Sequence, residues 1–143
     1  MKLRDHFSRL FHIGFRRTSM MLVGFVWFRG WNDMDDCGIY PNRDRAGGYD
    51  RYSELLARFI RDVRKDLSTP DLPFVIGVMG VGGPVDKYSP EQQRYRAVHQ
   101  NFRNAMAAPA SLPEFEGNVT TVLTKKYWDL ELAGLRARKA KIK

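Results

Sequence analysis

The sequence contains a single cysteine, Cys37, and no apolar run long enough to cross a membrane. One cysteine excludes an internal disulfide and a cysteine-based metal cluster. A membrane-spanning helix would need about 20 consecutive apolar residues. The chain has 143 residues, of which 43% are hydrophobic and 13% aromatic, and this composition is typical of one globular domain. We therefore expect no membrane partner, no metal and no cofactor.

The net charge of +8 lies at the two ends of the chain. Residues 1–20 carry five basic side chains and one acidic side chain, and residues 125–143 carry seven basic and two acidic ones. The segment between them has a net charge of −1. A surface built to bind phosphates should be basic on the folded body. The charge pattern therefore predicts that nucleic acid is not a partner.

Apolar runs and helical periods alternate along the chain. The run from Leu22 to Phe28 is short, rich in Val and aromatic residues and followed by glycine, which is typical of a buried parallel strand. Similar strands are expected over 74–79 and 118–124. Helices are expected over 49–67, from Pro90 onward, and in the basic segment 125–143. The alternation predicts an α/β domain, with a three-layer parallel sheet whose flanking helices cover both faces.

We interpret residues 1–21 as a basic N-terminal extension, and residues 22–143 as the α/β domain, which ends in a basic helix. The extension is rich in arginine and poor in acidic residues, as a transit peptide is, but it lacks the continuous apolar centre of a secretory signal. The location is therefore left open, with the cytoplasm as the default expectation.

Loops 29–48, 80–89 and 124–128 should gather at the carboxyl edge of such a sheet, where α/β proteins keep their functional groups. The first of them begins with Gly30-Trp31-Asn32-Asp33. Glycine lets a ligand approach the backbone closely, and an asparagine amide can donate to an oxyanion. The alternative is that Asn32 and Asp33 only close a turn.

Other groups are better explained by structure than by chemistry. Glycines at 77, 80, 82 and 83 could form a phosphate cradle, but their spacing favours a tight turn after a buried strand. His99 is interpreted as a packing residue in the second helix. The carboxylates of Asp33, Asp35 and Asp36 could bind a cation, but three such loop carboxylates are more often solvated, or paired with Arg43 and Arg45. Four loop aromatics could stack on a sugar ring or anchor their loops: Trp31, Tyr40, Tyr127 and Trp128.

The block GWND resembles the Gly-x-Asn-Asp block of the SGNH (GDSL-type) hydrolases. The sialate O-acetylesterase branch of that superfamily, a group of carbohydrate esterases, is similar over VWFRGWNDMDDCGIYPNRDRAGGYDRYSELLARFIRDVRKDL, PFVIGVMGVGG, HQNFRNAMAAPASLPEFEGNV and KKYWD. This resemblance covers residues 24–140. It implies an SGNH/flavodoxin-like sheet, an acylated carbohydrate as substrate, and Gly30 and Asn32 as oxyanion-hole groups. Trp31, Asp33, Arg29 and Tyr40 are the accompanying substrate-binding candidates.

The sequence departs from that family in its catalytic blocks. It has no Gly-Asp-Ser-like block, and none of its three histidines stands three residues after an aspartate. A serine without an imidazole is a poor nucleophile. We therefore expect an incomplete fold and a chain without hydrolytic activity of its own, and the alternative is a non-catalytic carbohydrate- or protein-binding module. An incomplete sheet also predicts self-association through its exposed edges.

Overall fold

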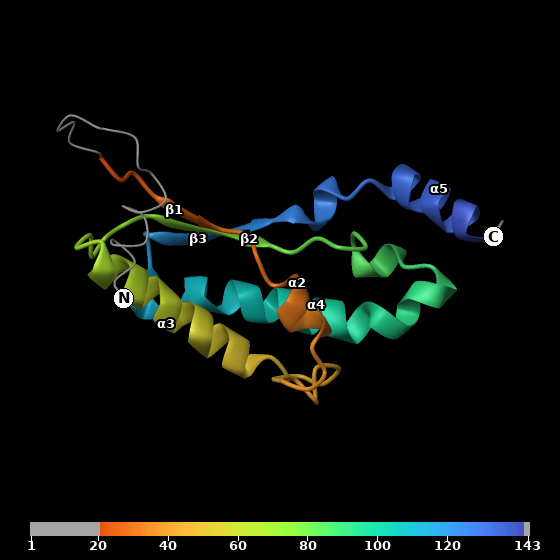
Figure 1. Ribbon diagram of the computed structural model, residues 1–143, viewed down its shortest axis with the longest axis horizontal. Coiled ribbons are helices and arrows are strands. Elements are labelled where there is room, and N and C mark those ends of the chain that lie inside the picture. The colour runs from red at the N-terminus through yellow and green to blue at the C-terminus, as the bar shows by residue number, and fades with distance from the viewer. Residues whose placement is uncertain (1–20, 142–143) are drawn as a thin grey trace, which may run out of the picture.

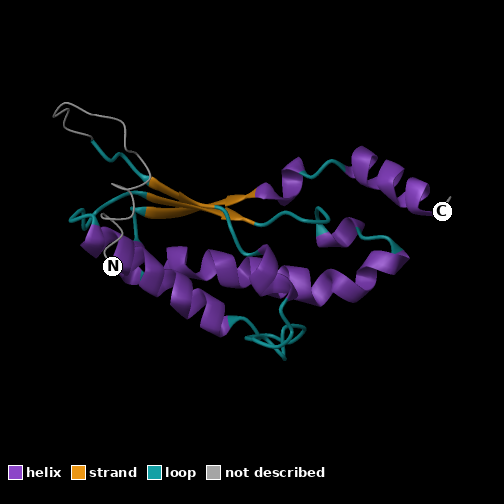
Figure 2. Cartoon of the chain, in the orientation of Figure 1, coloured by secondary structure: helices purple, strands orange, loops and turns teal. Residues whose placement is uncertain are grey.

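The computed structural model describes residues 21–141, so the expected N-terminal extension lies almost entirely outside the described residues. Figures 1 and 2 show a thin sheet with two long helices packed beneath it. The strands and α-helices follow one another as β1 (Phe25–Trp27), α2 (Trp31–Asp35), α3 (Asp50–Asp66), β2 (Phe74–Val78), α4 (Arg96–Ala107), β3 (Val119–Leu123) and α5 (Leu130–Lys141).

The three strands form one parallel sheet in the order β1-β2-β3. Phe25 pairs with Phe74, and Phe74 pairs in turn with Val119. The predicted mixed α/β class, the parallel strands and the flanking helices are therefore confirmed. The strand expected over Leu22–Phe28 is shorter than predicted, because it pairs with β2 over three residues only.

The core lies between the sheet and the pair α3 and α4. Phe74, Ile76 and Val78 of β2 point toward these helices and have 1% or less of their surface exposed. Ile60 and Val63 of α3 pack against them from the helix side. The Phe25 ring stacks on Phe74 at 4.7 Å, so aromatic contacts extend the core under β1. Alternation along β2 therefore sends every second side chain into one apolar cluster.

The expectation that helices cover both faces of the sheet is wrong for the described residues. Helices α3 and α4 lie on the same face (Figure 1) and share one core. Parallel crossovers are right-handed in nearly all proteins, and both crossovers here advance in the same direction, from β1 to β2 and from β2 to β3. Two right-handed crossovers in one direction place their helices on one face, and only a reversal of strand order would place a helix on the other.

Apolar side chains are consequently exposed on the opposite face. Val26 of β1 is 69% exposed, and Val122 of β3 is 42% exposed. The Phe28 ring, 61% exposed, lies over Gly77. A Cβ at position 77 would come within 2.4 Å of that ring, which explains the glycine in the middle of a strand.

A buried arginine fixes the amino edge of the sheet. Arg64, near the end of α3, donates to the Leu72 carbonyl oxygen at 2.9 Å and to Asn118 Oδ1 at 2.7 Å. Its guanidinium also lies over the Phe115 ring, 5.2 Å from the centroid. These contacts join the end of the first crossover helix to the starts of β2 and β3.

The last helix, α5, extends away from the sheet beyond β3 (Figure 1). Between residues 21 and 141, no helix combines the length and the apolar content that crossing a bilayer requires.

The exposed sheet face generates a prediction about association. Val26→Lys should reduce self-association of the chain, since lysine on an edge strand opposes strand pairing and removes apolar surface from that face. Sedimentation velocity over a concentration series measures the effect. Leu55→Lys is the matched control, because Leu55 is 50% exposed on the solvent side of α3. A monomeric wild-type chain, or an equal change in both variants, would contradict the prediction.

Candidate functional site

The three expected loops all start at the carboxyl edge of the sheet, and those after β2 and β3 are in contact. The Thr124 hydroxyl, just after β3, donates to the Val78 carbonyl oxygen at 2.7 Å. A Cβ on Gly80 would meet the Lys125 backbone nitrogen at 2.5 Å, so the loops after β2 and β3 touch. A Cβ on Gly83 would meet the Trp128 ring at 3.3 Å. The loop after β1 leaves the same edge and contacts α4, because Gly30 packs on Phe102.

Gly30 is held in a conformation that other residues rarely adopt. It is the N-cap of α2 with φ 142°, and it is buried. A Cβ there would come within 2.7 Å of the Phe102 ring and 3.0 Å of the Tyr52 hydroxyl oxygen. The Tyr52 hydroxyl donates to the Arg29 carbonyl oxygen at 3.1 Å and accepts from Trp27 Nε1 at 3.2 Å. Burial raises the pKa of Tyr52 to about 12, so this hydroxyl remains a donor at ordinary pH. The end of β1 is therefore rigidly placed.

Asn32 lies in the first turn of α2 with its side chain exposed. Its backbone carbonyl accepts from the Asp36 N–H at 2.9 Å, while its side-chain amide makes no hydrogen bond within the described residues. An asparagine that closes a turn uses its side chain for that purpose. The Asp36 side chain does close a turn, because its Oδ1 accepts from the N–H groups of Gly38 and Ile39 at 2.8 and 2.9 Å. The Asn32 amide is therefore available to a ligand.

The four substrate-binding candidates have different environments. Trp31 is 55% exposed beside Asn32, Asp33 is partly exposed, and the Arg29 side chain is exposed. These three side chains surround the turn. Tyr40 is 2% exposed and packs against the Tyr49 ring at 5.0 Å. Its ring belongs to the core, so of the four candidates Tyr40 exposes the least surface to a sugar, and its role in substrate binding stays a prediction.

The glycine-rich loop after β2 is a turn built around an arginine. Arg103 of α4 donates through Nε to the Met79 carbonyl oxygen at 3.0 Å, and through Nη2 to those of Val81 and Gly83 at 2.8 and 2.9 Å. A phosphate cradle would turn backbone N–H groups inward. Here the loop turns carbonyl oxygens inward, toward a cation, so the preference for a tight turn over a phosphate cradle is confirmed.

Two of the three loop carboxylates, Asp35 and Asp36, are engaged by the protein. Asp35 pairs with Arg43 at 3.5 Å, and Asp36 bonds to backbone N–H groups. In residues 21–141, no three His, Cys, Asp or Glu side chains are grouped closely enough to hold a metal ion.

His99 is the one histidine within residues 21–141. Its Nδ1 lies 2.6 Å from the Tyr88 hydroxyl oxygen, and its ring stacks on Tyr95 at 5.7 Å. Burial, and then the charge of Arg103, lower its pKa from 6.5 to about 4. No serine in the described part of the chain bonds to this ring, and His6 and His12 lie outside that part. His99 is therefore a packing residue, as expected.

Sequence reasoning missed Arg103, which organises the loop after β2. It lies within a run of α4 residues whose neighbours Phe102, Ala105 and Met106 are buried. A charged residue adjoining an apolar helical face was the available signal, since a charged side chain that is buried there needs hydrogen-bond partners.

Comparisons of the chain with protein-family models, with curated proteins and with solved structures gave no match.

Gly30→Ala should destabilise the fold by about 2 kcal/mol or more, because it combines backbone strain with a collision against Phe102. Urea unfolding followed by circular dichroism measures this change. Gly134→Ala is the matched control, since a Cβ at position 134 of α5 meets nothing within 4 Å. It should be neutral or slightly stabilising. Equal effects of the two substitutions would refute the close packing at Gly30.

His99→Phe should make stability less dependent on pH. The folded pKa of about 4 lies below the ordinary 6.5, so the unfolded chain binds the proton first. The wild-type protein should therefore lose stability as pH falls from 6.5 to about 4. The loss attributable to His99 should be about 1–2 kcal/mol, reduced from the full shift because the ring is partly exposed. Urea unfolding at neutral pH and near pH 4 measures this loss of stability. If the variant loses as much stability between the two pH values as the wild-type protein does, the assignment is contradicted.

Proposed function

We propose that this chain is related to the SGNH-type carbohydrate esterases and presents Asn32, positioned by Gly30, to the acyl group of an acylated sugar. The observation that carries the proposal is the exposed Asn32 amide, which makes no hydrogen bond within the described residues, at the carboxyl edge of a parallel sheet. Donors placed in advance of reaction stabilise the charge on a tetrahedral intermediate. The resemblance of the GWND block to that superfamily supports the same role.

The proposed contribution is electrostatic and not that of a nucleophile or base. The Ser53 hydroxyl donates to the Ala105 carbonyl oxygen, and the Ser89 hydroxyl donates to Glu91. The described histidine is occupied by aromatic packing. Without a base to accept its proton, a serine hydroxyl attacks an ester slowly. We infer that the described residues bind and polarise an acyl group without cleaving it.

A non-catalytic binding module is the second candidate. Exposed aromatic side chains near the same edge favour it, since such rings can stack on a sugar: Trp31 at 55%, Tyr127 at 70% and Trp128 at 37% exposure. In this alternative the aromatic rings recognise the sugar, and the acyl group is not required.

Asn32→Asp should abolish acyl-dependent binding, because it replaces the amide donor by a carboxylate of the same shape. We expect the Asn32 NH₂ resonances of the wild-type chain to shift on titration with an O-acetylated sugar, and not with the same sugar deacetylated. Asn42→Asp, in an exposed turn, is the control for the added charge. Equal shifts with both sugars would favour the binding module.

The same chain should not hydrolyse a chromogenic acetyl ester above the buffer rate. If it does, and Asn32→Ala lowers the rate by about a hundredfold or more, the proposed lack of activity is wrong while the oxyanion role stands.

A further inference from the structure

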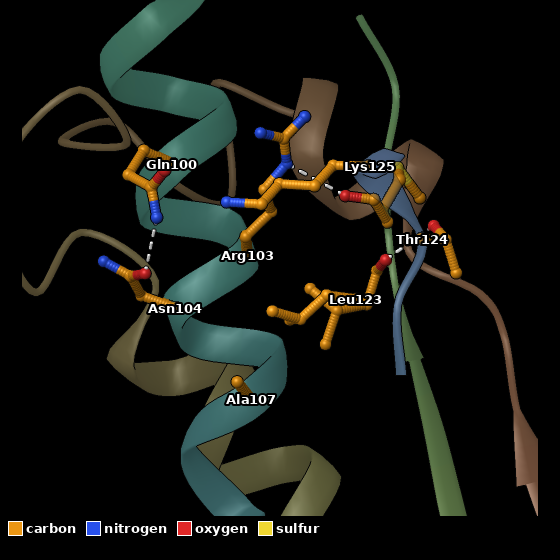
Figure 3. A pocket seen from close by; sticks show the side chains of 9 residues that line it. Gln100, Arg103, Asn104, Ala107, Leu123, Thr124 and Lys125 are labelled. Carbon is orange, nitrogen blue, oxygen red and sulfur yellow. Dashed lines mark hydrogen bonds between the residues drawn. The ribbon is translucent and has the colours of Figure 1, made fainter. Parts of the chain in front are cut away.

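A pocket of about 130 Å³ lies between α4 and the carboxyl ends of β2 and β3. Helix α4 contributes Gln100, Arg103 and Asn104 to its wall, and the chain after β3 contributes Thr124 and Lys125. Figure 3 shows the Lys125 side chain extending toward α4 beside Arg103. A single water needs about 10–15 Å³ of such volume, so the pocket can hold a small molecule or ion.

Arg103 has one group of donors without an acceptor. The side chain is 5% exposed, and its Nε and Nη2 donate to the three loop carbonyls. Its Nη1 is buried and has no hydrogen-bond partner. Buried polar groups are nearly always paired, and leaving a charged one unpaired is costly. Nη1 is therefore the part of the guanidinium whose hydrogen-bonding capacity the described residues do not use.

The charge of the pocket is also uncompensated. None of the ion pairs within the described residues includes Arg103 or Lys125, and the pocket wall contains no acidic side chain. Two cations consequently share one concave, partly enclosed site. Carbonyl dipoles stabilise the guanidinium, but they supply no net negative charge.

The two amide side chains of the pocket wall bond to each other. Gln100 Nε2 donates to Asn104 Oδ1 at 2.8 Å (Figure 3), which leaves the Asn104 amide nitrogen without an acceptor among the described residues. A guanidinium and an ammonium together match the oxygens of a phosphate or carboxylate group.

We propose that this pocket binds a small oxyanion, the phosphate or carboxylate group of an acidic metabolite, between Arg103 and Lys125. Nη1 has no accessible surface, so the anion reaches it when a neighbouring side chain moves. Lys125 is long, flexible and partly exposed, and it can move while keeping its ammonium on the anion. The proposal does not rest on the esterase proposal, because none of Gly30, Trp31 and Asn32 lines this pocket.

The test is a calorimetric titration of the whole chain with inorganic phosphate, and separately with acetate, at constant ionic strength and neutral pH. We expect saturable binding at one site. Lys125→Gln should weaken it by about tenfold or more, since hydrogen bonds to charged groups contribute at least that much. Lys126→Gln is the matched control, because it removes the same charge from the exposed neighbouring residue and should change affinity less than about twofold.

Arg103 itself is followed by NMR rather than by substitution, because losing its three carbonyl contacts could unfold the loop. Its side-chain N–H resonances should shift with the same saturation curve as the calorimetric signal. Tighter binding of phosphate than of acetate, or the reverse, would identify the class of ligand. Absence of saturable binding, equal effects of the two lysine substitutions, or saturation without a change at Arg103 would overturn the proposal.

Discussion

The direction of the two crossovers determines most of this structure. Strands β1, β2 and β3 lie in chain order and run parallel, so each connection must return from the carboxyl edge to the amino edge on the way to the next strand. Because both connections advance the same way, right-handedness places α3 and α4 on one face. The core forms there, the opposite face keeps Val26 and Val122 exposed, and three loops start at one edge.

Two buried arginines hold the segments at the two edges of the sheet in place. Arg64 binds backbone oxygens at the amino edge, and Arg103 binds the loop after β2 at the carboxyl edge. A guanidinium has five donors in a rigid fork, so it can hold several carbonyls of an irregular segment at once. At Arg103 the three loop carbonyls bind Nε and Nη2, and Nη1 has no hydrogen-bond partner within the described residues. The loop architecture and the proposed anion site thus both depend on Arg103.

The functional proposals use separate parts of the same edge. Asn32 follows β1 and is exposed, while Arg103 and Lys125 lie near the ends of β2 and β3. Gly30 connects the two parts, because its lack of a side chain lets the turn after β1 rest on Phe102, next to Arg103 in α4. A change that displaces α4 should therefore disturb both, whereas a change at Asn32 or Lys125 should affect only one.

Periodicity in the sequence by itself determined the strands, the helix over 49–67 and the placement of the loops at one edge, because these follow from local pattern and parallel order. It also singled out Asn32 and correctly interpreted His99 as packing. It could not show that Tyr40 is buried, that Leu55 faces solvent or that one sheet face is uncovered. Those outcomes depend on contacts between segments far apart in the chain, as does the role of Arg103, whose acceptors lie 20 to 24 residues earlier. Only the packed tertiary structure decides which donors are satisfied.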